Sequence, residues 1–115
     1  MKPDRDKIKN MFGGRCAYCG TELKKGWHID HVKPIYRDNR IKPDRAGTDT
    51  EDNMYPACPR CNKWKDVFTV EIFRSEILKQ IERLRKTNPG FRLAEDYGLI
   101  KEMKNPVVFW FEKYK

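Results

Sequence analysis

The chain has 115 residues, and its 25 Lys and Arg side chains outnumber 17 Asp and Glu, which gives a formal net charge of +8. Charged residues make up 37% of the sequence and hydrophobic residues 38%, against averages of roughly 25% and 45–50% for soluble domains. This length excludes a large multidomain enzyme and allows one domain with a thin core. No apolar run approaches the ~18 residues that span a bilayer, and the charged N-terminus lacks the apolar segment of a secretory signal, so we expect a cytoplasmic protein without membrane contact.

The basic excess points to a polyanionic partner, because Lys and Arg side chains attract phosphate whatever its sequence. Nucleic acid is therefore the first partner to consider. Lys-rich helix faces also occur as ordinary solvated surface, so charge alone leaves both interpretations open. A membrane surface fits less well, since the sequence has no strongly amphipathic basic helix with a bulky aromatic face.

The four cysteines stand in two Cys-x-x-Cys pairs, Cys16/Cys19 and Cys58/Cys61, which residues 20–57 separate. Each pair presents two thiolates from one tight turn, and two such knuckles supply the four soft ligands of a tetrahedral zinc site. Disulfides are the alternative, but a reducing cytosol disfavours them, and a redox Cys-x-x-Cys motif explains only one pair. We therefore predict a structural zinc ion that stabilises the fold by on the order of 10 kcal/mol.

The sequence between and after the knuckles predicts a hairpin and a helix. Apolar and polar residues alternate in the segment GWHIDHVKPI, residues 26–35, which predicts a short strand that ends near its proline. Residues 36–52 are rich in Pro, Gly, Asp and Asn and predict a loop. We expect residues 53–57 to form a second strand that pairs with the first. A helix is expected to start near Asn62, with Pro59 suited to a first turn and Asn62 a possible cap.

One ordered pattern, Cys-x-x-Cys, Asp-His, Asn-x4-Cys-x-x-Cys-Asn-x-x-Lys, runs through the first half of the chain. In this sequence it consists of Cys16/Cys19, Asp30-His31, Asn53, Cys58/Cys61, Asn62 and Lys65. The pattern resembles the zinc-knuckle branch of the HNH endonuclease family, over about residues 15–65. The resemblance implies an α+β chain with a ββα-metal (His-Me finger) core, in which a hairpin and a helix surround one divalent ion. It also implies hydrolysis of phosphodiester bonds in nucleic acid, usually DNA.

The resemblance also implies a role for each polar residue of the pattern. Asp30 and Asn62 are expected to bind Mg²⁺ or Mn²⁺, which prefer hard oxygen ligands. His31 is the expected general base, because an imidazole ordinarily titrates near neutral pH. Since adjacent strand residues point to opposite faces, Asp30 and His31 can bracket one phosphate. Asn53 is expected to brace the loop and orient the strand that carries His31. Taken singly, the Asp-His pair can also be a surface hydrogen-bonded pair, and Asn62 only a helix cap.

Three basic residues of the second knuckle and its helix, Arg60, Lys63 and Lys65, lie beside the expected site. They are expected to contact phosphates of the nucleic acid. An ordinary solvated basic turn is the alternative.

The C-terminal half predicts a scaffold without a catalytic cluster. Thr69 is a candidate cap for one helix from about Val70 to Lys86, which has a single apolar stripe. Residues 91–99 predict a short helix, and residues 107–111 a buried strand. We therefore divide the chain into a zinc-containing nuclease core, residues 1–68, and an extension packed on it, residues 69–115, within a single domain. The alternative is an extension that contacts DNA or mediates dimerisation.

The sequence thus predicts a metal-dependent HNH endonuclease that hydrolyses DNA, with zinc as structural ion and Mg²⁺ or Mn²⁺ as catalytic ion. The chain also resembles small stand-alone HNH proteins of bacteria and phages. One site per chain implies nicking by a monomer and possible double-strand cleavage by a homodimer. RNA stays open as a substrate, because no element distinguishes a 2′-hydroxyl. The alternatives are a non-catalytic, zinc-stabilised nucleic-acid-binding module and a zinc-fold adaptor for another protein.

Overall fold

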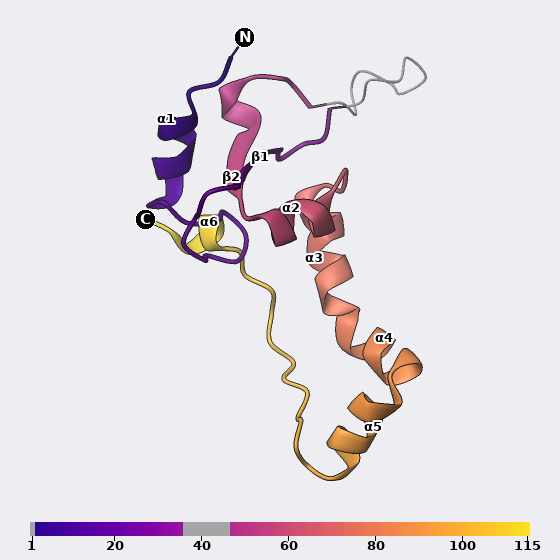
Figure 1. Ribbon diagram of the computed structural model, residues 1–115. Coiled ribbons are helices and arrows are strands. Elements are labelled where there is room, and N and C mark those ends of the chain that lie inside the picture. Colours follow the sequence, from indigo (N-terminus) through magenta and orange to yellow (C-terminus); the bar gives the residue numbers. More distant parts are fainter. Residues whose placement is uncertain (1, 36–46) are drawn as a thin grey trace, which may run out of the picture. The chain divides into compact units, whose positions relative to one another are not determined.

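The computed structural model describes residues 2–35 and 47–115. They divide into two compact units: the first joins the described residues up to Phe73 with Val108–Lys115, and the second is Arg74–Val107. Figure 1 shows the helices and the small sheet along the chain. This mixture confirms the predicted α+β class. Among the described residues, no helix combines the length and the apolar character that a bilayer crossing needs.

A two-stranded antiparallel sheet lies in the first unit. Strand β1 (His28–His31) pairs with β2 (Met54–Ala57), with Asp30 opposite Tyr55 and His31 opposite Met54. The two predicted strands are therefore confirmed. Along β1, His28 is exposed, Asp30 is buried, and Ile29 and His31 are half-buried. Of the predicted loop, residues 36–46 lie outside the described residues, and its end forms the short 3-10 helix η3 (Glu51–Asn53).

Helix α2 (Pro59–Lys65) packs on both strands and completes a ββα arrangement. It begins earlier than we predicted, because Cys58 is its N-cap and the Cys58 sulfur accepts the Cys61 amide at 3.4 Å. Pro59 occupies the first turn, where its missing amide hydrogen costs nothing. Asn62 lies inside the helix, so the interpretation of Asn62 as its cap is wrong.

The N-terminal segment leads into the first knuckle. Helix α1 (Arg5–Lys9) begins at Asp4, whose carboxylate accepts the Lys7 amide, and it continues as the 3-10 helix η1 (Asn10–Phe12). Helix α1 packs on β2 and buries Ile8. The knuckle then turns back on itself, with the Cys16 amide bonded to the Thr21 carbonyl at 2.8 Å.

The end of the chain returns to this knuckle. The amides of Trp110 and Phe111 donate to the carbonyls of Tyr18 and Ala17, at 3.0 and 2.8 Å. The Tyr18 ring contacts those of Phe109 and Phe111 edge to face, and Phe109 is 2% exposed. The prediction of a strand over residues 107–111 is wrong, since helix α6 (Trp110–Lys113) begins within it. The aromatic run is typical of a strand, but its main-chain groups bond to a loop and its rings supply the burial.

Three helices follow α2. Helix α3 (Val70–Leu78) begins in the first unit and ends in the second, which also holds α4 (Gln80–Thr87) and α5 (Pro89–Asp96). The single helix predicted over residues 70–86 is therefore interrupted at Lys79. At this break the Gln80 side chain donates to the Glu76 carbonyl at 2.8 Å, a bond that a continuous helix would make with the Gln80 main-chain amide. Asn88 ends α4 and caps α5 by accepting the Phe91 amide.

Candidate metal centre and active site

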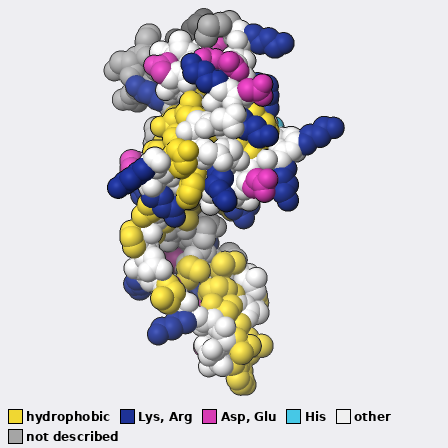
Figure 2. Space-filling view, turned by 90° about the vertical axis from the view of Figure 1, so that its left-hand side faces the viewer, with side chains coloured by type: hydrophobic (Ala, Val, Ile, Leu, Met, Phe, Trp, Pro, Cys, Tyr) yellow, Lys and Arg dark blue, Asp and Glu magenta, His cyan; other side chains and the backbone are white. Residues whose placement is uncertain are grey.

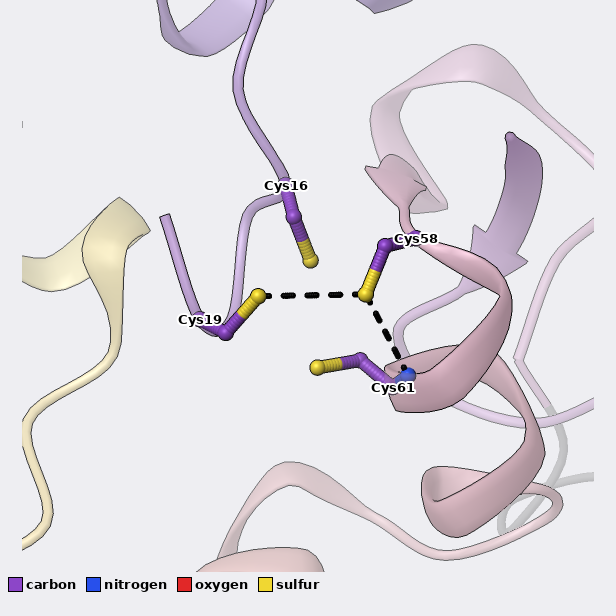
Figure 3. A group of neighbouring side chains, drawn as sticks. All are labelled: Cys16, Cys19, Cys58 and Cys61. Atoms are coloured by element: carbon purple, nitrogen blue, oxygen red, sulfur yellow. Dashed lines mark hydrogen bonds between the residues drawn. The ribbon is translucent and has the colours of Figure 1, made fainter. Parts of the chain in front are cut away.

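The four cysteines meet in the first unit. Cys16 and Cys19 come from the loop after η1, and Cys58 and Cys61 from the start of α2 (Figure 3). All four sulfurs point toward one another and lie within 4.8 Å, with the Cys19 and Cys58 sulfurs 3.8 Å apart. Four thiolates around a tetrahedral zinc ion, each at about 2.3 Å, lie about 3.8 Å from one another. None of the four is in a disulfide, so the donor set and its spacing fit the predicted zinc ion.

Crowding of the sulfurs changes their acidity. A hydrogen bond between Cys16 and Cys61 lowers the pKa of the Cys16 thiol to about 4 and raises the pKa of Cys61. Burial raises the pKa of Cys58. Such a group of sulfurs cannot become fully anionic without a cation among them, and a divalent ion supplies that charge.

Arg60 faces this cluster. The negative charge of Cys61, followed by a hydrogen bond to Cys19, raises the pKa of the Arg60 guanidinium. Zinc with four thiolates keeps a net negative charge, which Arg60 can offset. The structure therefore gives Arg60 a neighbour other than phosphate, and its contact with nucleic acid stays a prediction. Lys63 is exposed on α2.

Asp30 is the centre of a buried polar group. Asp30 is 4% exposed, and its Oδ2 atom accepts from the Tyr18 hydroxyl at 2.5 Å and from Lys65 Nζ at 3.0 Å. Burial raises the pKa of the Asp30 carboxyl, and the charge of Lys65 opposes that shift. Burial, and then the charge of Asp30, raise the pKa of the Tyr18 hydroxyl, which therefore stays protonated as the donor.

Lys65 lies in the last turn of α2 and is fully buried. Its ammonium also donates to the His31 carbonyl oxygen at 3.0 Å. The expected contact of Lys65 with a phosphate does not fit this burial, because a fully enclosed ammonium cannot reach a ligand in solvent. Asn62 is half-buried, three residues earlier on α2, so both residues lie on the same face of that helix.

His31 pairs with a carboxylate that the sequence analysis missed. Its Nε2 atom lies 2.9 Å from Asp49 Oδ1, in the segment between the two strands. No spacing or periodicity singles out Asp49 in this polar segment. His31 and Asp30 also line one surface cleft of about 160 Å³, together with Ile29, Pro34, Ile35, Asp66 and Val67.

Asn53 fastens the chain on both sides of the segment outside the described residues. Its side-chain oxygen accepts the Lys33 amide at 2.9 Å, and its nitrogen donates to the carbonyls of Lys33 and Thr48 at 2.8 and 2.9 Å. Gly47 passes so close that an added Cβ would lie 1.9 Å from the Lys33 carbonyl oxygen. Asn53 therefore fixes the main chain directly after β1, two residues beyond His31.

The comparison with protein families agrees with this geometry. The model of the HNH endonuclease family matches residues 16–67, which cover both knuckles, the hairpin and α2. The predicted resemblance to this family is therefore confirmed over residues 16–67. The match favours a nuclease or nucleic-acid-binding function for this region. Searches of the curated proteins and of the solved structures gave no match.

Proposed function

We propose that this protein is an endonuclease that hydrolyses phosphodiester bonds in DNA with the help of a divalent metal ion. The observation that supports this most directly is the cleft lined by Asp30 and His31. Asp30 and His31, adjacent on one strand, both border this cleft, so a carboxylate and an imidazole are supplied by neighbouring residues. Phosphodiester hydrolysis requires an activated water and neutralised phosphate charge, and these two groups are suited to supplying them.

Asp30 and Asn62 are the residues that we assign to Mg²⁺ or Mn²⁺. Both hydrogen bonds that the described residues make to the Asp30 carboxylate fall on Oδ2, so Oδ1 is the oxygen assigned to the metal. Asn62 contributes a neutral amide oxygen from the helix face that also carries Lys65. When bound, the ion would neutralise phosphate charge and stabilise the leaving oxygen.

His31 is the proposed general base, and Asp49 orients it. A carboxylate can only accept a hydrogen bond, so a neutral His31 ring places its proton on Nε2, toward Asp49. The Nδ1 atom is then the acceptor that takes a proton from the attacking water. Asn53 contributes by fixing the main chain after β1, and we propose that it holds the histidine-bearing strand in place.

Basic side chains supply the attraction for the polyanion. Figure 2 shows Lys and Arg side chains spread over the visible face among fewer Asp and Glu side chains. We propose that Lys63, which is exposed on α2, contacts phosphates, and that Arg60 does so at the edge of the cysteine cluster. With one site per chain, a monomer would nick one strand, and a homodimer could cut both.

The test is cleavage of supercoiled plasmid in Mg²⁺ or Mn²⁺ by wild type, His31→Ala and His28→Ala. The chain has only these two histidines, and His28 is exposed on the same strand, so His28→Ala is a matched control. We expect His31→Ala to lower the nicking rate by about 10²–10⁴-fold and His28→Ala to retain it. Equal cleavage by wild type and His31→Ala would contradict the assignment of His31.

The pairing of Asp30 with Lys65 also suits a second function, a zinc-stabilised module that binds nucleic acid without cutting it. In that case Asp30 would be a structural partner of a buried cation. This alternative predicts no metal-dependent cleavage of duplex, single-stranded or branched DNA. It also predicts salt-dependent DNA binding that Asn62→Ala leaves unchanged.

A further inference from the structure

Three polar groups are buried together around Asp30, which lines the cleft: the Tyr18 hydroxyl, the Asp30 carboxylate and the Lys65 ammonium. Tyr18 is 3% exposed, Asp30 4% and Lys65 0%. Enclosing a charge is costly unless it is paired and hydrogen-bonded, so the buried Asp30 carboxylate depends on its two donors, and Lys65 depends on Asp30. Asp30 Oδ2 receives both donors, which fixes the position of the carboxylate.

The two donors come from the two segments that carry the cysteines. Tyr18 lies between Cys16 and Cys19 in the first knuckle. Lys65 ends α2, the helix whose first turn carries Cys58 and Cys61. A zinc ion bound by all four sulfurs would therefore hold both hydrogen-bond donors of Asp30 in place.

Both donors are themselves rigidly held. The Tyr18 ring contacts the rings of Phe73 and Phe109 edge to face, with centroids 5.6 and 5.4 Å away. The Lys65 ammonium also donates to the His31 carbonyl oxygen. The same cation thus binds the side chain of Asp30 and the main chain of the next residue, the proposed base.

We propose that Tyr18 and Lys65 are positioning residues that orient Asp30 for the catalytic metal ion, and that they link the structural zinc site to it. This inference rests on the proposed function, because it takes Asp30 as a ligand of that ion. Tyr18 and Lys65 hold Oδ2 and leave Oδ1 toward the ion. Disorder at the cysteines then weakens the second metal site, although no cysteine touches it.

The test measures Mn²⁺ binding to the full zinc-loaded chain without DNA, by calorimetry and by electron paramagnetic resonance. Tyr18→Phe keeps the ring and removes only the hydroxyl. We expect it to keep its zinc content and its melting temperature within a few degrees, while its Mn²⁺ affinity falls by roughly 10- to 100-fold. Lys65→Met removes the second donor at similar length, and we expect a loss of affinity at least as large. If Lys65→Met does not fold, Tyr18→Phe carries the test alone.

Tyr55→Phe is the matched control. Tyr55 lies opposite Asp30 in the hairpin, and the substitution removes a single hydroxyl, as Tyr18→Phe does. We expect it to bind Mn²⁺ as wild type does. Unchanged Mn²⁺ affinity in Tyr18→Phe, with Asp30→Asn binding weakly, would overturn the positioning role and leave the proposed function intact. Equal Mn²⁺ binding by wild type and Asp30→Asn would overturn both, because Asp30 would then not be a ligand.

Discussion

Lys65 is the residue whose proposed role the structure changes most. Lysine is almost never fully buried unless it is paired, and here the Asp30 carboxylate and the His31 carbonyl satisfy its ammonium. The Cys-Asn-x-x-Lys pattern predicted that Lys65 belongs to the site. Its burial could not be deduced, because the direction of its side chain depends on how α2 lies on the hairpin. A basic residue of a nuclease motif can therefore serve the carboxylate and not the substrate.

Asp49 allows a prediction about the proposed base. Asp49→Asn keeps an acceptor oxygen near His31 but removes the negative charge, so we expect the nicking rate to fall by roughly 10- to 100-fold. In a His31→Ala background the same substitution should have little further effect, because the two residues act as a unit. Nicking kinetics of the four proteins measure this. Two independent, additive losses would show that Asp49 does not act through His31.

Asn53 allows a prediction about stability. Asn53→Ala removes three hydrogen bonds to the main chain, and we expect it to lower the free energy of unfolding by about 2 kcal/mol. Asn10→Ala is the control, since the Asn10 side chain donates one exposed bond to the Asp6 carbonyl, and it should cost less than about 1 kcal/mol. Urea denaturation of the zinc-saturated proteins measures both. Similar values for the two variants would argue against the bracing role of Asn53.

At the scale of elements, sequence patterns and structure agree where periodicity dominates. The two strands and helix α2 were predicted, although α2 begins earlier than expected, because alternation and a proline in the first turn are local signals. The break between α3 and α4 was not predicted, because the apolar stripe continues through it; at the break, the Gln80 side chain donates to the Glu76 carbonyl. The predicted division into residues 1–68 and 69–115 stays a prediction.

An ion-pair network in the second unit allows a prediction about pH. Arg85 on α4 binds Glu95 on α5 through two bonds of 2.8 Å and Glu102 through one of 2.6 Å. Hydrogen bonds from Arg85 lower the pKa of both carboxyls below 4.5. Groups with a lowered pKa stabilise the folded state above their unfolded pKa. That contribution is lost as the pH falls through the lowered value.

Arg85→Met should return the titration of Glu95 and Glu102 to the ordinary range and slightly lower thermal stability at neutral pH. Carboxyl titration followed by NMR measures the first effect. Lys86→Met is the control, because Lys86 pairs only with Glu82 among the described residues, at 3.2 Å, and it should leave both titrations unchanged. Low pKa values that persist in Arg85→Met would contradict the assigned cause.

At the scale of the whole molecule, the cysteine cluster joins parts of the chain that are far apart in sequence. Cys16 and Cys19 precede the hairpin, and Cys58 and Cys61 follow it. The composition predicted a thin core, and within the first unit that core includes the aromatic rings of Tyr18, Phe73 and Phe109. A metal ion is therefore expected to supply stability that apolar burial does not.

We predict one zinc ion per chain, and that a strong chelator unfolds the first unit. Loss of the ion removes on the order of 10 kcal/mol of stabilisation and leaves four crowded sulfurs without a cation. Elemental analysis gives the stoichiometry, and near-UV circular dichroism follows the packing of the aromatic rings. Zn²⁺ added back should restore the spectrum, whereas Mg²⁺ should not, because thiolates are soft ligands. A chain that keeps its aromatic signal after chelation would contradict this prediction.

The sequence predicted the cysteine cluster and the two strands, since each has a fixed spacing or a local period. It could not identify Tyr18, because a tyrosine inside a knuckle has no distinguishing pattern until its hydroxyl is seen at Asp30. The sequence analysis also missed Asp49, because no pattern distinguishes it from the other polar residues of its segment. The strand predicted over residues 107–111 failed because aromatic burial does not specify which backbone partner the segment meets.

Phe73 and Phe109 stand where the chain leaves the first unit and where it comes back, and their rings stack 5.4 Å apart. The chain thus leaves the first unit and re-enters it at neighbouring positions, so residues 74–107 form an insertion between them. Insertions anchored in this way tolerate change in length, because closing a longer loop adds little entropic cost. We therefore expect that residues 74–107 can be replaced by unrelated sequence while the cysteine cluster and the hairpin keep their geometry.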